Sequence, residues 1–124
     1  MTTAIILAGG RSSRFKSEIP KQFYKLNGRE LIDYSIMTFL DCKRIDSIII
    51  VVPKEYCIEI QKKYPDCLVV EGGGSRRESS FNGLQACLYN TKKVLIHDAA
   101  RALIEESLIL NCINALDNAK AVSP

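Results

Sequence analysis

The chain has 124 residues, of which 47% are hydrophobic and 25% are charged, and its formal net charge is +3. These values are typical of one globular domain and exclude a disordered or low-complexity chain. The small excess of positive charge comes without a basic stripe or interleaved aromatic residues, so we expect no nucleic-acid partner.

Apolar, β-rich runs alternate with helical patterns along the chain. The runs predict strands at residues 3–7, 47–52, 67–71 and 93–97. Each run is nearly continuously apolar, as in strands that are covered on both faces. The segments that follow them predict helices at residues 30–40, 54–64, 76–89 and 105–118. This alternation predicts an α/β fold, with a mainly parallel sheet and helices on both faces.

Other features narrow the class of protein. No apolar run approaches the length of about 20 residues that spans a bilayer, and the N-terminus lacks the pattern of a signal peptide. We therefore expect a cytoplasmic protein with no membrane partner. The five cysteines are scattered, which indicates neither a disulfide framework nor a zinc site, and most should be buried as small apolar residues.

The first predicted strand leads into a glycine-containing basic loop, residues 7–21. Ala8, Gly9 and Gly10 allow close approach of the backbone, whose N–H groups can point at phosphate oxygens. The loop also holds four cations, namely Arg11, Arg14, Lys16 and Lys21. A turn with a solvated basic face is the plainer alternative, because the loop matches neither common phosphate-binding glycine motif. The cations at the carboxyl end of a strand favour a phosphate site.

The third predicted strand is followed by three glycines, residues 72–74. Ser75 is expected to cap the next helix, with Glu78 completing a capping box. Capping does not require three glycines, whereas a flat base that packs on bare backbone would use them.

The fourth predicted strand ends in His97 and Asp98. A carboxylate at this position could bind Mg²⁺ together with substrate phosphates, and the alternative is a turn or capping aspartate. His97 is expected to be structural, because no serine or cysteine nucleophile pattern lies beside it.

Taken in order, three segments resemble the 2-C-methyl-D-erythritol 4-phosphate cytidylyltransferases. They read L-A-G-G-R-S-S-R-F with P-K-Q-F, then G-G-G-S-R-R-E-S, then V-L-I-H-D-A-A-R. The resemblance implies a Rossmann-like nucleotidyltransferase fold and a divalent metal, usually Mg²⁺. It also implies transfer of CMP from CTP to a sugar-alcohol phosphate, with release of pyrophosphate, in the non-mevalonate isoprenoid pathway.

The resemblance assigns roles to individual residues. Arg14 and Lys21 match the catalytic pair, whose fixed cations would stabilise negative charge on the attacked α-phosphate. Asp98 matches the position that binds the metal. The positions that match CTP contacts are Ala8, Gly9, Gly10, Gly73, Gly74, Ser79, Asp98, Ala99 and Arg101.

The sequence departs from the family pattern at three positions. Ser12 replaces a glycine, Gly74 replaces a commonly acidic residue, and Ala102 replaces a proline. The family's sugar-phosphate pocket and dimer arm come from a second half of the chain. We therefore expect residues 1–124 to be one nucleotide-binding domain that is incomplete at its C-terminus and weak or inactive alone, and the complete protein to be a homodimer.

Three alternatives remain open from the sequence. The first segment also resembles the ribitol-5-phosphate cytidylyltransferases of teichoic acid synthesis. A nucleotide-binding module without catalysis is a second possibility. A dinucleotide-dependent reductase is less favoured, since Lys54 stands where that class needs an acidic residue after the second strand.

Overall fold

The structure is a computed structural model that describes residues 1–8, 23, 25–101 and 103–117. Its centre is a four-stranded sheet in the order β5-β4-β1-β6, in which every pair is parallel. The strands are β1 (Thr2–Leu7), β4 (Ser47–Val52), β5 (Leu68–Glu71) and β6 (Lys93–Asp98). All four predicted strands are confirmed, with ends that differ by at most one residue.

The four predicted helices are also present; the first has the predicted length and is shifted by one residue, and the other three are shorter than the sequence pattern predicts. They are α1 (Leu31–Asp41), α2 (Cys57–Lys63), α3 (Arg76–Gln85) and α4 (Glu106–Ala115). The segment before α2 is a separate 3-10 turn, η2 (Lys54–Tyr56). Tyr89, where α3 was expected to end, is fully exposed, so no core contact holds a last helical turn there. Among the described residues, no helix is both long enough and apolar enough to cross a membrane.

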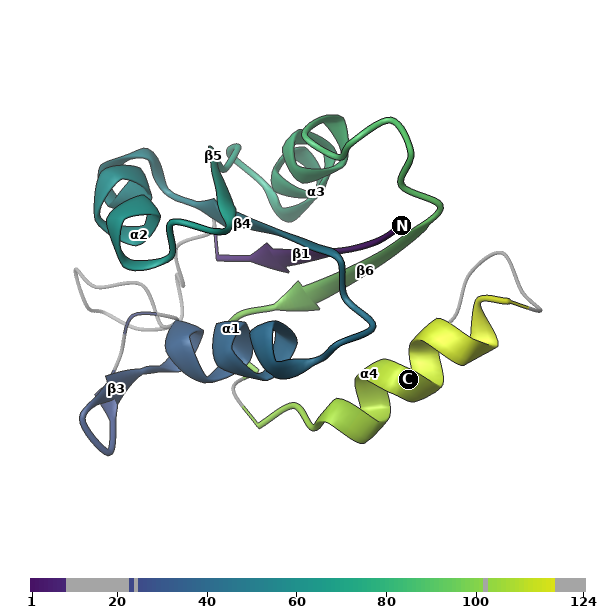
Figure 1. The fold of residues 1–124 in the computed structure, drawn as a ribbon. Helices are drawn as coiled ribbons and strands as arrows, with labels where there is room; N and C mark the ends of the chain where they lie inside the picture. Colours follow the sequence, from purple (N-terminus) through teal and green to yellow (C-terminus); the bar gives the residue numbers. More distant parts are fainter. Residues whose placement is uncertain (9–22, 24, 102, 118–124) are drawn as a thin grey trace.

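Helices cover both faces of the sheet, as predicted (Figure 1). The alternate strand residues Ile6 and Ile50 pack with α1, α2 and α4 in one apolar cluster. Ile5 and Val51 point to the opposite face, where α3 lies. Because side chains alternate along a strand, two separate clusters form on the two sides of one sheet. Both faces of β1 and β4 are therefore buried, which explains their continuous apolar sequences.

A small antiparallel hairpin precedes α1 and was not predicted. Its strands are β2 (Lys25–Leu26) and β3 (Arg29–Glu30). Asn27 and Gly28 form the turn, both with positive φ, at 53° and 82°. Asn-Gly is the preferred pair for this two-residue turn, so the signal was present in the sequence although the strands are too short to show a pattern.

Candidate nucleotide site

The carboxyl end of β1 lies at the point where the strand order reverses. From β1 the chain moves outward to β4 and β5, and then returns to the other side of β1 as β6. Ligands of open α/β sheets bind outside the strand ends at such a switch point. Leu7 pairs with Asp98 there, so the last residues of β1 and β6 lie side by side.

Two of the expected nucleotide-binding residues line this switch point with fixed backbone. The Ala8 N–H donates to the Val51 carbonyl oxygen at 2.6 Å, and the Ala99 N–H donates to the Leu7 carbonyl oxygen at 2.9 Å. Both alanine side chains are buried. These bonds extend the ladder past the strands, since they attach the chain after β1 to β4 and the chain after β6 to β1.

The segment after β5 joins α3 through capping contacts. Ser75 is the N-cap residue, and its Oγ accepts a hydrogen bond from the Glu78 N–H at 3.1 Å, as expected. The Glu78 carboxylate accepts from the Gly74 N–H at 3.0 Å. In the expected capping box Glu78 would accept from the Ser75 N–H, whereas here it accepts from the N–H of the preceding residue, Gly74.

Gly73 and Ser79 are coupled within the same segment. Ser79 is buried, and its Oγ accepts from the Gly73 N–H at 3.1 Å. A Cβ on Gly73 would lie 2.3 Å from the Glu78 Cβ, which no side-chain rotation can relieve. Close packing inside the chain therefore requires glycine at position 73. The Ser79 hydroxyl can still donate its own proton, and its expected role as a CTP contact stays a prediction.

An ion pair connects the glycine segment to the end of β6. Arg76 Nε lies 3.2 Å from Asp98 Oδ1, and the Asp98 side chain is 36% exposed. Since β5 and β6 are the two edges of the described sheet, this contact reaches past the end of β1. The second and third segments singled out in the sequence are thus brought together, and Arg76 is a residue of this site that sequence reasoning did not assign.

The chain beyond Asp98 is held by a buried polar contact set. The Arg101 N–H donates to the Asp98 carbonyl oxygen at 3.0 Å, which forms a turn that leaves Arg101 exposed. Ser35, on α1, donates from Oγ to the Ala99 carbonyl oxygen at 3.1 Å. His97 Nε2 lies 3.0 Å from the Arg101 carbonyl oxygen, so this nitrogen carries the proton and donates.

His97 is structural in this arrangement. Its ring packs against Phe39, with 5.5 Å between centroids. Burial lowers the pKa of His97, and the bond to the Arg101 carbonyl opposes that shift. A ring that is packed on one side and hydrogen-bonded to backbone holds the turn after β6, in agreement with the expectation.

The remaining expected site residues lie outside the described part of the chain. These are the catalytic pair Arg14 and Lys21, together with Gly9 and Gly10. Among the described residues, no three His, Cys, Asp or Glu side chains are grouped to hold a metal. Asp98 is one partly exposed carboxylate at the switch point, which suits a Mg²⁺ ion that takes its other ligands from phosphates and water.

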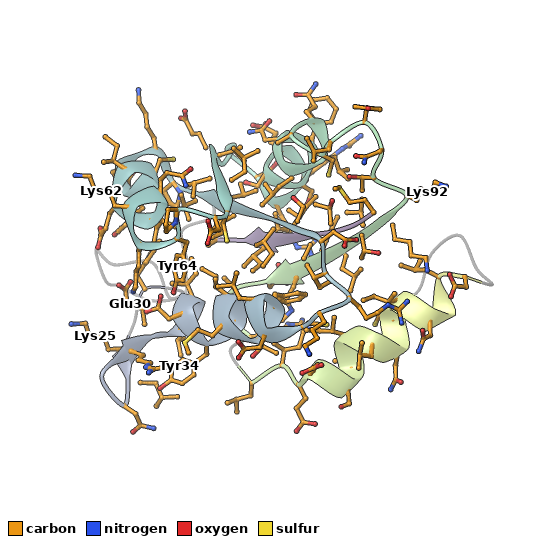
Figure 2. The ribbon with its side chains drawn as sticks, in the orientation of Figure 1. Lys25, Glu30, Tyr34, Lys62, Tyr64 and Lys92 are labelled. Atoms are coloured by element: carbon orange, nitrogen blue, oxygen red, sulfur yellow. The ribbon has the colours of Figure 1, made fainter. Side chains whose placement is uncertain are left out.

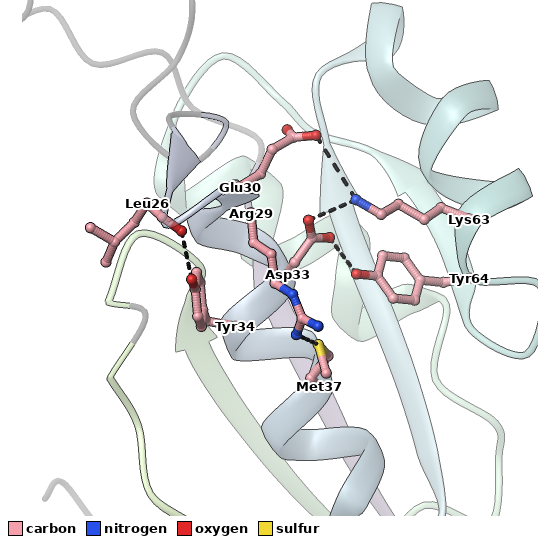
Figure 3. A network of polar contacts seen from close by, with 8 residues as sticks. All are labelled: Leu26, Arg29, Glu30, Asp33, Tyr34, Met37, Lys63 and Tyr64. Carbon is pink, nitrogen blue, oxygen red and sulfur yellow. Dashed lines mark hydrogen bonds and ion pairs between the residues drawn. The ribbon is translucent and has the colours of Figure 1, made fainter.

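A separate polar network lies at the start of α1 (Figure 3). Asp33 is only 5% exposed. It accepts hydrogen bonds from Lys63 Nζ at 2.7 Å and from the Tyr64 hydroxyl, both at the end of α2. Burial and the bond to Asp33 raise the pKa of Tyr64 well above its usual range. Burial also raises the pKa of Glu30, and the Lys63 ammonium opposes that shift.

The same residues border a cavity of about 370 Å³. Figure 2 shows Lys25, Glu30, Tyr34 and Tyr64 gathered on the hairpin side of α1, far from Lys92. None of the expected nucleotide-binding residues that the structure describes lines the cavity. Lys63 at this cavity already pairs with Asp33 and Glu30, so the strand ends remain the candidate nucleotide site.

Comparisons with known proteins agree with the geometry of the strand ends. Residues 2–124 match the family model of 2-C-methyl-D-erythritol 4-phosphate cytidylyltransferase (IspD). The enzyme of that name from Lachnospira eligens is 39% identical over 90% of this chain and 52% of its own length. The one from Clostridium botulinum is 38% identical over 100% of this chain and 58% of its own length. The chain thus spans about half the length of the curated relatives that it matches.

Solved structures show the same relationship. The crystal structure of 4-diphosphocytidyl-2C-methyl-D-erythritol synthase from Anaerococcus prevotii aligns with a TM-score of 0.79 and 33% identity, over 93% of this chain and 50% of that one. The bifunctional IspDF from Campylobacter jejuni aligns with a TM-score of 0.81 and 27% identity, over 95% of this chain and 31% of that one. The expected Rossmann-like nucleotidyltransferase fold is confirmed.

Proposed function

Because the chain belongs to the 2-C-methyl-D-erythritol 4-phosphate cytidylyltransferase family, we propose that the complete protein transfers CMP from CTP to 2-C-methyl-D-erythritol 4-phosphate. The observation that carries the proposal is the convergence of three segments at the switch point. Ala8 and Ala99 directly follow the neighbouring strands β1 and β6 there. Arg76, from the segment after β5, contacts Asp98 at the end of β6. Phosphates and a pyrimidine ring would be bound by these strand ends and by the glycine segment 72–74.

In the proposed reaction, one bond forms and one bond breaks at the α-phosphorus of CTP. A phosphate oxygen of the acceptor attacks that atom, and the bond to the bridging oxygen of pyrophosphate breaks. Its electron pair leaves with the pyrophosphate. Arg14 and Lys21 would stabilise the charge that develops on the α-phosphate, and catalysis would rest on positioning and charge neutralisation. No covalent intermediate with the enzyme is required.

Mg²⁺ is part of the proposal, with Asp98 as its protein ligand. When bound, the ion would neutralise triphosphate charge. Asp98 is paired with Arg76 in this structure, so Arg76 would have to share or release that carboxylate. We also propose a cytoplasmic homodimer, which cell fractionation and light scattering of the complete protein would test.

The test is pyrophosphate release by the complete protein with CTP and each of two acceptors. We expect release with 2-C-methyl-D-erythritol 4-phosphate and little with ribitol 5-phosphate. The reverse preference would overturn the acceptor assignment. Lys21→Ala and Arg14→Ala should lower kcat by about a hundredfold or more while CTP affinity is mostly kept, because the lost interaction belongs to the transition state. CTP binding without turnover in the wild type would instead identify a non-catalytic nucleotide-binding module.

A further inference from the structure

The ring of Phe23 is stacked on the ring of Tyr56. The ring centroids are 3.9 Å apart and the planes are inclined by 12°. Phe23 is 6% exposed and belongs to the larger apolar cluster, against which Tyr56 is also packed. Tyr56 ends the η2 turn directly after β4, and its N–H donates to the Pro53 carbonyl oxygen at 2.9 Å. The ring that receives Phe23 is therefore carried by a short turn attached to a central strand.

Phe23 follows Lys21 by two residues in the sequence. Two residues of extended chain span at most about 7 Å. Phe23 is thus the described residue that stands nearest to Lys21 in the sequence. Tyr56 is distant from the basic loop in the sequence, so the sequence alone gives no sign of a connection between them.

The chain after Phe23 is attached to the same part of the molecule a second time. The Tyr34 hydroxyl donates to the Leu26 carbonyl oxygen at 2.5 Å, which ties the hairpin to α1. Asp33 then ties α1 to Lys63 and Tyr64 at the end of α2 (Figure 3). Both attachments lead to residues between β4 and β5, which therefore contact Phe23 and, through Asp33, the start of α1. Among the contacts of the described residues named here, the Phe23–Tyr56 stack is the one nearest to the basic loop in the sequence.

We propose that Tyr56 is a positioning residue, which acts through its stack on Phe23 to place Lys21 for reaction with CTP. The inference rests on the proposed function, in which Lys21 is catalytic. The flat ring of Tyr56 is the part required for this role, because stacking on it sets both the separation and the inclination of the Phe23 ring. The Tyr56 hydroxyl is not required for this role, and no contact of Tyr56 with substrate is assumed.

The experiment compares variants of the complete protein by steady-state kinetics with CTP and 2-C-methyl-D-erythritol 4-phosphate. Tyr56→Phe keeps the ring and should stay within about twofold of the wild-type kcat. Tyr56→Leu keeps apolar volume without a flat ring and should lower kcat by about tenfold or more, with a smaller change in KM for CTP. Ile60→Val, in the same apolar cluster on α2, controls for a general loss of core packing and should leave kcat unchanged.

A double-mutant cycle separates positioning from simple packing. In a Lys21→Ala background, Tyr56→Leu should cause no further loss of kcat, because its effect passes through Lys21. If Tyr56→Leu lowers kcat by the same factor in the Lys21→Ala background as in the wild type, the proposal is overturned. A kcat for Tyr56→Leu equal to that of Ile60→Val would also overturn it. A wild type that is active and depends on Lys21 while Tyr56→Leu is unaffected would refute this inference alone. An inactive wild type would overturn both proposals.

Discussion

Replacing Asp33 by asparagine should lower the free energy of unfolding by about 1–2 kcal/mol. Asp33 is a buried carboxylate in the first turn of α1 that joins this helix to Lys63 and Tyr64. Asparagine has nearly the same shape, and its carbonyl oxygen can still accept from the Tyr64 hydroxyl. The substitution therefore removes the negative charge and the acceptor for Lys63 Nζ, because the amide nitrogen of asparagine can only donate.

Two contributions set the size of this loss. The Lys63 side chain is 43% exposed, so solvent screens its ion pair with Asp33 and the pair is worth about 0.5–1 kcal/mol. A carboxylate in the first turn also interacts favourably with the helix N-terminus, by about 0.3–1 kcal/mol. Asp33→Ala should cost about 1 kcal/mol more, because the Tyr64 hydroxyl then loses its acceptor as well.

Asp41→Asn provides the matched control, since it makes the same change at the other end of the same helix. Asp41 is exposed in the last turn of α1, which holds no basic residue. A carboxylate is unfavourable at a helix C-terminus, so this variant should lose no stability. Urea unfolding followed by far-ultraviolet circular dichroism measures both variants, and high salt should reduce the loss at Asp33. Equal losses at the two positions, or no loss at Asp33, would refute a stabilising role for the buried carboxylate.

Two further predictions concern packing and burial. Gly73→Ala should destabilise the chain by about 1–3 kcal/mol in thermal unfolding, because the new Cβ would clash with the Glu78 Cβ. A variant as stable as the wild type would contradict this close packing. Burial raises the pKa of Cys67 to about 11, and the negative charge of Asp66 adds to the shift. Alkylation of Cys67, mapped by mass spectrometry, should therefore be slow until the chain unfolds. Because the folded state favours the neutral thiol, the resulting stability is present below pH 9 and lost as the pH rises toward 11, and Cys67→Ser should remove that loss.

The sequence predicted the central sheet because its signals are local. The strand at residues 47–52 is an uninterrupted apolar run, and burial on both faces is the physical cause of that run. Helix α4 shows the limit of the same reasoning. The apolar residues at positions 108, 109, 112, 113 and 116 predict one buried face. Ile109 and Ile113 are buried, whereas Leu108 is 39% exposed. Periodicity thus located the helix correctly and made its buried face too wide.

The contacts that organise the site were beyond sequence reasoning, since each joins distant segments. Arg76 meets Asp98 only because α3, which follows β5, packs against β4 and β1 and so brings its first residue close to the end of β6. Phe23 meets Tyr56 only because the chain returns to the end of β4 after the basic loop. Either residue read alone looks like an ordinary surface cation or core aromatic. Their positions follow from the strand order, which the sequence does not fix pair by pair.

The glycine segment shows how structure separates the demands of folding from those of a ligand. Three glycines in a row suggested a surface for a flat base, but Gly73 is already required by its contact with Glu78. Gly74 is different, because among the described residues a Cβ there would meet only Glu78 Oε2, at the ordinary distance of 3.8 Å. Folding therefore tolerates alanine at position 74. If Gly74→Ala keeps full stability and yet weakens CTP binding, the requirement for glycine at that position comes from the nucleotide and not from the fold.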